Sequence, residues 1–188
     1  MIALRSLRSV WVELLLTGCS LGGLPACLVS VPSLENAEVA GRWSLTVKNE
    51  DDNCMFEGWT AGGVGTFEIV MNQFGEDRRE VNARLDGLLG LALWLGLGTQ
   101  DLSGVVEGDE LSLTMFGARD ETASTGCVFR REIRVKTRIE GDRLRNGEII
   151  QRPRPISATG CERESTCRAL QSFDGVRVGA ADAATRSP

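Results

Sequence analysis

Histidine and tyrosine are absent from this chain of 188 residues. Without histidine, the chain can form no Ser-His-Asp triad, no Cys-His pair and no histidine-ligated metal site. It also lacks a Gly-x-Ser-x-Gly elbow, a P-loop and a dinucleotide-binding fingerprint. We therefore predict a protein that is not an enzyme and that has no catalytic residue, no cofactor and no metal ion.

Charge of one sign is not concentrated in any part of the sequence. The 21 basic and 26 acidic residues are interspersed and give a formal net charge of -5. A nucleic-acid-binding protein would show a basic patch or stripe, so no nucleic acid is predicted as a partner. The acidic stretch Asp51-Asp52-Asn53 lacks the ligand spacing of an EF-hand loop and is typical of a solvated turn.

Long apolar runs are also missing beyond the N-terminus, where none reaches the roughly 18 residues of a membrane-spanning helix. The longest run, 88–97 (LLGLALWLGL), contains two glycines. We predict that this run is a buried segment of the core, and the alternative is a lid over the fold.

The N-terminus is predicted to carry an export signal. A short apolar run behind Arg5 and Arg8 ends in Leu16-Thr17-Gly18-Cys19, which resembles the lipobox of bacterial lipoproteins. There, a signal peptidase cuts ahead of a cysteine that has been given a lipid. The resemblance implies a signal peptide over 1–18 and lipidation of Cys19. It also implies a protein that is anchored to a membrane of the bacterial cell envelope.

A second cysteine competes for this lipid. Leu24-Pro25-Ala26-Cys27 follows an uncharged stretch, whereas Glu13 interrupts the apolar run before Cys19. Cleavage at Cys27 leaves an even set of four further cysteines, while cleavage at Cys19 leaves Cys27 unpaired, which is unusual in an oxidising compartment. Cys27 is therefore the alternative lipidation site, and secretion without a lipid or no export at all is the third alternative.

The four remaining cysteines favour disulfides over zinc. Zinc sites commonly use short pair spacings and histidine ligands, whereas disulfides suit an exported chain. The candidates are Cys54, Cys127, Cys161 and Cys167. The sequence does not determine their connectivity. We expect a Cys54–Cys127 bond across the core and a Cys161–Cys167 bond that closes a small C-terminal loop.

Apolar residues recur at every second position from about residue 40 to 151, which is typical of strands with one buried and one wet face. The two stretches Glu107-Gly108-Asp109-Glu110 and Glu140-Gly141-Asp142-Arg143 place a Gly-Asp pair between such runs and predict hairpins. The predicted inward-facing set is Trp43, Leu45, Val47, Phe67, Ile69, Met71, Val81, Ala83, Leu85, Leu111, Leu113, Met115, Ile133, Val135 and Ile139.

The strand count predicts an all-β fold. About eight strands in an antiparallel meander are expected to close, or nearly close, into a small barrel. A water-soluble barrel is favoured, because Arg134, Lys136 and Arg138 on an outer face would be costly in lipid. Pro153 and Pro155 are expected to end the last strand. The predicted segments are a signal peptide (1–18), a tether (19–38), the β-barrel domain (39–152), a C-terminal segment closed by a disulfide (153–178) and a disordered tail (179–188).

Gly41-Arg42-Trp43 opens the first predicted strand and resembles the Gly-x-Trp motif of lipocalins. In that family the tryptophan plugs the closed end of an eight-stranded barrel, and an arginine from near the last strand packs across it. The resemblance implies that Trp43 is the plug, and that Arg145 or Arg152 is the covering cation. Bacterial lipocalins are often lipoproteins that hold a small apolar ligand in the barrel.

Two functions are open at this point. In the first, a membrane-tethered barrel binds a small apolar ligand or lipid, and the glycines near 62–63 and 87–98 belong to its mouth. In the second, the barrel is filled by its own medium to large side chains and serves as a structural or protein-interaction module of the envelope. We prefer the first, with the following predicted ligand-binding residues: Trp43, Phe67, Trp94, Leu113 and Ile133.

Overall fold

The computed structural model describes residues 35–56, 59–156 and 160–180. The predicted signal peptide, the lipidation candidates Cys19 and Cys27, and most of the predicted tether and tail lie outside these residues. The described chain is built from strands and one helix: β1 (Gly41–Asp52), β2 (Val64–Phe74), β3 (Glu80–Leu85), α1 (Gly87–Leu97), β4 (Asp101–Glu107), β5 (Glu110–Phe116), β6 (Glu121–Thr122), β7 (Val128–Glu140), β8 (Arg143–Pro155) and β9 (Ala169–Gly179).

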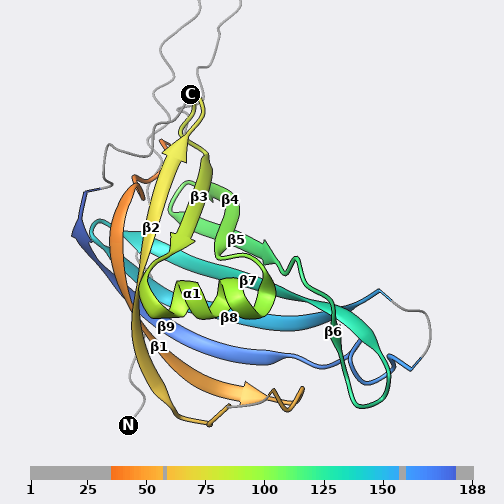
Figure 1. The fold of residues 1–188 in the computed structure, drawn as a ribbon. Helices are drawn as coiled ribbons and strands as arrows, with labels where there is room; N and C mark the ends of the chain where they lie inside the picture. Colours follow the sequence, from red (N-terminus) through yellow and green to blue (C-terminus); the bar gives the residue numbers. More distant parts are fainter. Residues whose placement is uncertain (1–34, 57–58, 157–159, 181–188) are drawn as a thin grey trace, which may run out of the picture. The chain divides into compact units, whose positions relative to one another are not determined.

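The strands form a closed antiparallel barrel (Figure 1). Neighbours along the chain pair with one another, β5 pairs with β7, and β9 returns to pair with β1. Eight strands close the barrel, and the two-residue strand β6 adds to β7 outside it. Closure removes the exposed strand edges that an open sheet would present. The prediction of an all-β meander that closes into a small barrel is confirmed.

The period of two places the predicted apolar set inside. Trp43, Leu45, Ile69, Met71, Leu111 and Leu113 are among the buried core residues. Both predicted hairpins form, with Gly108 and Gly141 at positive φ (63° and 60°), a conformation that glycine adopts at little steric cost. A bulge between Lys136 and Arg138 shifts the pairing of β7 with β8.

The C-terminal segment differs from the expectation, because it supplies a barrel strand. β8 continues through Pro153 and Pro155, and β9 then pairs on both sides, with β1 and β8. The pairing of β8 with β9 ends at Gln151 and Ala169. Beyond that point β8 has a neighbour only on its β7 side, and proline is tolerated on such an edge because no ladder bond is lost there.

The disulfides also differ from the expected pairs. Cys54 is bonded to Cys167, and Cys127 is bonded to Cys161. The register explains the first bond: Asp52 at the end of β1 lies opposite Ala169 at the start of β9. Cys54 comes two residues after Asp52 and Cys167 comes two residues before Ala169, so both cysteines lie just beyond the same end of the paired strands. Cys127 precedes β7, whose first residues pair with the end of β8, so the loop after β8 brings Cys161 to it. The expected connectivity was therefore wrong.

The apolar run 88–97 forms α1 and is not a buried core segment. Its N-cap is Asp86, and Gly98 ends it in the left-handed conformation at φ 79°. Of its residues, only Gly90 and Leu97 are buried. The core prediction was wrong because the interior is walled by the eight strands, and the helix lies at the end of the barrel with most of its side chains outside the core.

Candidate functional site

One end of the barrel is closed around Trp43. This side chain is fully buried, and its Nε1 donates to the carbonyl of Val39 over 2.8 Å. The guanidinium of Arg177 lies 4.6 Å from the indole ring and donates to the carbonyl oxygens of Ala40 and Glu38. A cation over an aromatic face is attracted by the ring's negative potential.

The covering cation therefore comes from β9, not from the two arginines expected. Arg145 instead approaches Glu140 and Asp174 at 4.0 and 3.8 Å. Arg152 lies opposite Glu132 in the register of β7 with β8. Both belong to β8, whereas Arg177 lies on β9, a strand that was not predicted to be part of the barrel.

The residues before β1 complete this closed end. The N–H of Ala37 donates to the carbonyl of Gly108 in the β4–β5 hairpin (2.8 Å). The side chain of Gln73 accepts from the N–H of Val39 and donates to the carbonyl of Ala37, both at 2.9 Å. Because backbone groups are paired here and Val39 is fully buried, this end is sealed by hydrogen bonds as well as by packing.

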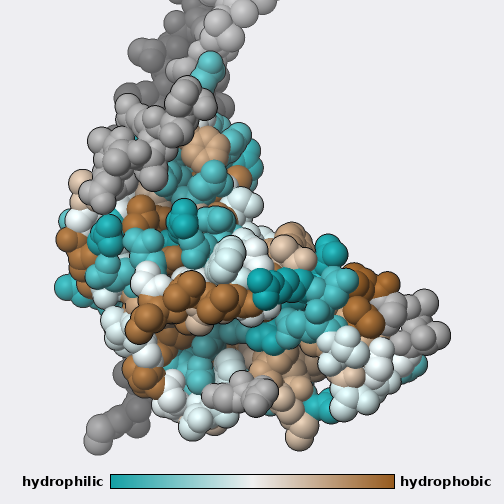
Figure 2. All heavy atoms as spheres, in the orientation of Figure 1, coloured by the Kyte–Doolittle hydropathy of each residue, from teal (hydrophilic) through white to brown (hydrophobic). Residues whose placement is uncertain are grey.

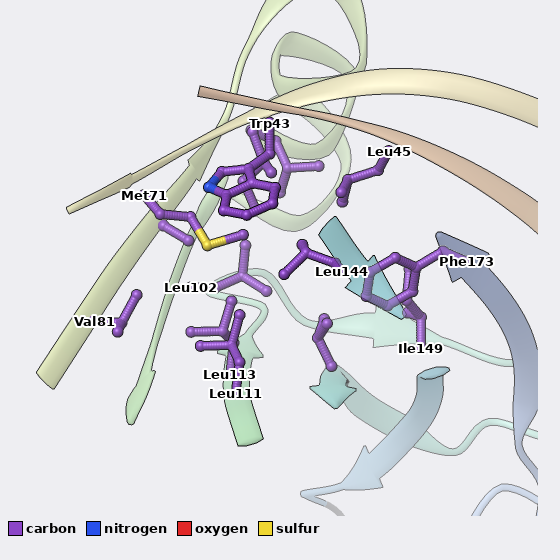
Figure 3. Close-up of a cluster of buried hydrophobic side chains, with 14 of the residues drawn as sticks. Trp43, Leu45, Met71, Val81, Leu102, Leu111, Leu113, Leu144, Ile149 and Phe173 are labelled. Carbon is purple, nitrogen blue, oxygen red and sulfur yellow. The ribbon is translucent and has the colours of Figure 1, made fainter. Parts of the chain in front are cut away.

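Above Trp43 the barrel encloses an apolar cavity of about 140 Å³. Its walls come from all eight barrel strands and from α1, and Figure 3 shows several of these side chains converging from different strands. All lining residues but two are apolar. They are Leu45, Phe67, Ile69, Met71, Leu85, Leu89, Leu93, Leu102, Leu111, Leu113, Met115, Ile133, Val135, Leu144, Ile149, Gln151, Gln171 and Phe173.

The two polar residues of the cavity are linked to each other. Gln151 Nε2 donates to Gln171 Oε1 over 3.2 Å, and Gln171 Nε2 donates to Asn49 Oδ1 over 2.7 Å. They add amide groups to a wall that is otherwise apolar. An apolar cavity with a few convergent polar groups is the usual construction of a small-molecule site.

The cavity adjoins a groove on the outside of the barrel. This outer groove has a volume of about 400 Å³ and runs along the start of β2, past Gly63 and Gly65. Phe67, Leu89 and Gln171 line both spaces. We call these three residues the mouth, because they are the residues that the cavity and the outer groove share.

Helix α1 covers the cavity beside the mouth. Leu89 and Leu93, four residues apart, lie on the same side of the helix and line the cavity. Gly90 allows this close approach, since a Cβ there would lie 2.1 Å from the carbonyl oxygen of Leu85. The lid alternative for this run thus describes its place in the fold.

The structure brings together three of the five predicted ligand-binding residues. Phe67, Leu113 and Ile133 line the cavity. Trp43 lies in the closed end and is not among the lining residues. Trp94 is about half exposed on the other side of α1, where it lines a separate depression with Arg42 and Arg84.

Sequence reasoning missed the glutamine pair. Gln151 lies two residues after Ile149, and Gln171 two residues before Phe173, and all four line the cavity. Extending the period of two through polar positions would have placed both glutamines inside the barrel. Their polarity and the prolines that follow Gln151 hid this signal.

The ionisable groups that the structure perturbs lie outside the cavity. Glu132 is 1% exposed and accepts from Arg154 Nε (2.6 Å) and Arg134 Nε (2.8 Å). Burial would raise the pKa of Glu132, but the hydrogen bonds from Arg154 and Arg134 outweigh it and hold that pKa below its usual value. This carboxylate stays ionised and fastens β7 to β8.

Within the described residues, no group of three or more acidic, cysteine or histidine side chains could hold a metal ion. No helix in that part of the chain is long and apolar enough to cross a bilayer. Comparison with protein-family models, with curated proteins and with solved structures finds no match. The fold and the site define a small closed β-barrel with two disulfides, an apolar cavity and a helical lid.

Proposed function

We propose that this protein binds a small apolar molecule inside its barrel while a lipid at its N-terminus tethers it to a membrane of the bacterial cell envelope. The observation that carries the proposal is the apolar cavity under α1, with its glutamine pair and its mouth. A barrel of eight strands is wide enough either to be filled by its own side chains or to hold one small ligand. The void favours the ligand.

The volume sets the kind of ligand. A dry cavity of about 150 Å³ lined by aliphatic and aromatic side chains can bind one benzene-sized molecule, and this cavity measures about 140 Å³. Sites for larger ligands occupy about 300–1,000 Å³. A ligand longer than one ring would therefore extend past Phe67 and Leu89 into the outer groove, which adds about 400 Å³. We infer an elongated molecule with an apolar tail, such as a fatty acid.

The two disulfides support a location in an oxidising compartment, such as the cell envelope. Bonds such as Cys54–Cys167 and Cys127–Cys161 form and persist in oxidising environments and are rare in the cytosol. An envelope location agrees with the lipobox-like Leu16-Thr17-Gly18-Cys19. Intact-mass analysis of the protein from bacterial membranes tests the tether: an acyl adduct on Cys19 or Cys27 is expected, and an unprocessed chain would overturn it.

Titration with parinaric acid, a naturally fluorescent fatty acid, tests ligand binding. We expect saturable binding at one site per chain. Ile133→Phe adds a ring to the cavity wall and should weaken binding by at least about tenfold. The matched control is Val178→Phe on the outside of β9, where the native side chain is 52% exposed, and this variant should bind normally. Circular dichroism confirms that both variants are folded.

A barrel filled by its own side chains, acting as a structural or protein-interaction module of the envelope, gives a different result. Parinaric acid would then show no saturable binding to the native chain, and Ile133→Phe would change nothing. That outcome would contradict the carrier function.

A further inference from the structure

The outer side of α1 is apolar and exposed. Leu88 is 87% exposed, and Leu91, Trp94 and Leu95 are 50%, 49% and 53% exposed. Single exposed apolar residues are ordinary on a soluble protein, whereas a contiguous group marks an interaction site. Figure 2 shows apolar residues in a row across the middle of the molecule, where Figure 1 places α1.

The composition of α1 is unusual for a helix on a protein surface. The eleven residues of α1 (GLLGLALWLGL) include no polar side chain, whereas a surface helix normally turns polar residues toward water. On the inward side of α1, the apolar residues Leu89 and Leu93 line the cavity, which explains why that side is apolar. The outward side has no such partner among the described residues, and its composition fits an apolar medium rather than water.

Two arginines flank this outward side. Arg84 lines a depression beside Leu91 and Trp94, and Arg119 donates from its guanidinium to the carbonyl of Leu95. Within the described residues, neither guanidinium forms an ion pair, although Asp101 lies opposite Arg84 in the register of β3 with β4.

Two of the nearby acidic groups pair with another arginine. Asp86 pairs with Arg42 at 3.3 Å, and Asp120 pairs with Arg130 at 2.7 Å. The guanidinium groups of Arg84 and Arg119 therefore lie beside the apolar face of α1 without a carboxylate within ion-pair distance among the described residues. These two cations complement anionic groups.

We propose that α1 docks on a lipid bilayer that contains anionic headgroups. Leu88, Leu91 and Leu95 enter the boundary between the headgroups and the acyl chains. Trp94 lies at headgroup level, where the amphipathic indole is favoured. The flanking arginines contact lipid phosphates. Interfacial helices usually combine an apolar face with a basic polar face, and here the barrel and its arginines take the place of the polar face.

A bilayer fits these observations better than a protein partner. A helix of eleven residues is about 16 Å long, and a stable dimer interface buries about 800 Å² on each partner, which a single short helix does not provide. A bilayer requires only apolar side chains and attraction to its headgroups. The absence of polar side chains on α1 leaves no hydrogen-bonding pattern with which to select a protein surface.

Docking would place the mouth next to the membrane. Leu89 belongs both to the mouth and to α1, so an apolar ligand could pass between bilayer and cavity with little exposure to water. This role in transfer rests on the proposed function, whereas docking itself does not.

Sedimentation with vesicles tests the docking. The full chain carries Cys19→Ser and Cys27→Ser, so that no N-terminal lipid can supply the binding, and the N-terminal apolar run is identical in every variant. Vesicles contain phosphatidylcholine with or without phosphatidylglycerol. The test variant is Leu91→Glu/Leu95→Glu. Its matched control, Val176→Glu/Val178→Glu, alters two residues that are 45% and 52% exposed at the opposite end of the barrel.

We expect Leu91→Glu/Leu95→Glu to lower the partition coefficient of the protein onto vesicles at least about a hundredfold, because two leucine side chains leave the apolar phase. The control variant should bind vesicles as the unsubstituted protein does. Arg84→Gln and Arg119→Gln should each weaken binding about fivefold on vesicles with phosphatidylglycerol and have no effect without it. In a Trp11→Phe background, tryptophan emission should shift to the blue on vesicles, and Trp94→Phe should abolish the shift.

Three results would overturn the docking. Equal partitioning of the test and control variants would show that α1 does not contact the bilayer. An oligomer that Leu91→Glu/Leu95→Glu dissociates would assign the face to a second copy of the chain. An unchanged Trp94 emission on vesicles would exclude insertion. Parinaric acid binding is measured on the same samples, so failed docking with intact ligand binding leaves the carrier function standing.

Discussion

The two ends of the barrel are closed by different means. At one end, Trp43 is buried beneath residues 37–40, with Arg177 across its ring and backbone groups paired through Gln73. At the other end, where β1, β3 and β8 finish and β7 and β9 begin, the chain is held by two disulfides and covered by α1. The cavity extends to this second end, where α1 covers it.

In the proposed function, this difference assigns stability to the Trp43 end and ligand exchange to the α1 end. Packing and satisfied hydrogen bonds make the Trp43 end rigid, because opening it would expose buried groups that have no other partner. At the α1 end, two disulfides limit how far the strands can spread, and most side chains of the helix lie outside the core. In the proposed carrier function, α1 would open as a lid without unfolding of the domain.

The largest effect is expected from the disulfides at the α1 end. Cys54 and Cys167 are separated by 113 residues, so their bond restricts the unfolded chain more than the Cys127–Cys161 bond, with a separation of 34. Replacing the first pair with serines should lower the free energy of unfolding by about 5 kcal/mol, and replacing the second pair by about 4 kcal/mol. Urea denaturation measures both, and the reverse ranking would contradict the loop-entropy account.

Two tryptophans allow the ends to be compared directly. Trp43→Ala removes a fully buried side chain from the closed end and should lower the free energy of unfolding by about 3–5 kcal/mol. Trp94→Ala removes a half-exposed side chain from α1 and should lower it by no more than about 1 kcal/mol. Equal losses in thermal or urea unfolding would show that the two ends contribute alike to stability.

A smaller effect should come from the buried carboxylate on β7. The pKa of Glu132 is lower in the folded protein than its ordinary value of 4.5. Its stabilisation is therefore complete above that value and is lost as the pH falls from about 4.5 through the folded pKa. Glu132→Gln should cost about 1–3 kcal/mol at pH 7 and should flatten the loss of stability below pH 4.5. Urea denaturation at several pH values measures this loss. If the variant loses as much stability below pH 4.5 as the native chain does, Glu132 does not contribute to the acid sensitivity.

Much of the barrel could be predicted because its strands alternate clearly. Runs such as Trp43, Leu45 and Val47 point inward at every second residue, and the Gly-Asp turns mark where the chain reverses. β9 could not be recognised in this way. Two of its inward positions are Gln171, which is polar, and Gly175, which has no side chain. A Cβ at position 175 would lie only 2.7 Å from Leu45 Cδ2, so glycine is needed there. The inward side of β9 therefore lacks the row of apolar residues that marks the other strands.

The candidate site was predictable only in part for related reasons. Phe67, Leu113 and Ile133 were found because they follow the period of two. Gln171 was missed with its strand, and the disulfide pairs were wrong because they depend on the register of that strand with β1. The run 88–97 is apolar on all sides, so no periodicity could show which residues face the barrel and which face outward.

The pairing of β1 with β9 also determines when this chain can finish folding. Arg42 lies opposite Gly179, near the two ends of the described barrel. A ribosome must therefore release almost the whole domain before the barrel can close, and contacts of such long sequence separation form slowly. Until then, β1 and β8 each lack a neighbour and can pair with other chains. A chain cut short before residue 169 would keep both edges open and would be prone to aggregate.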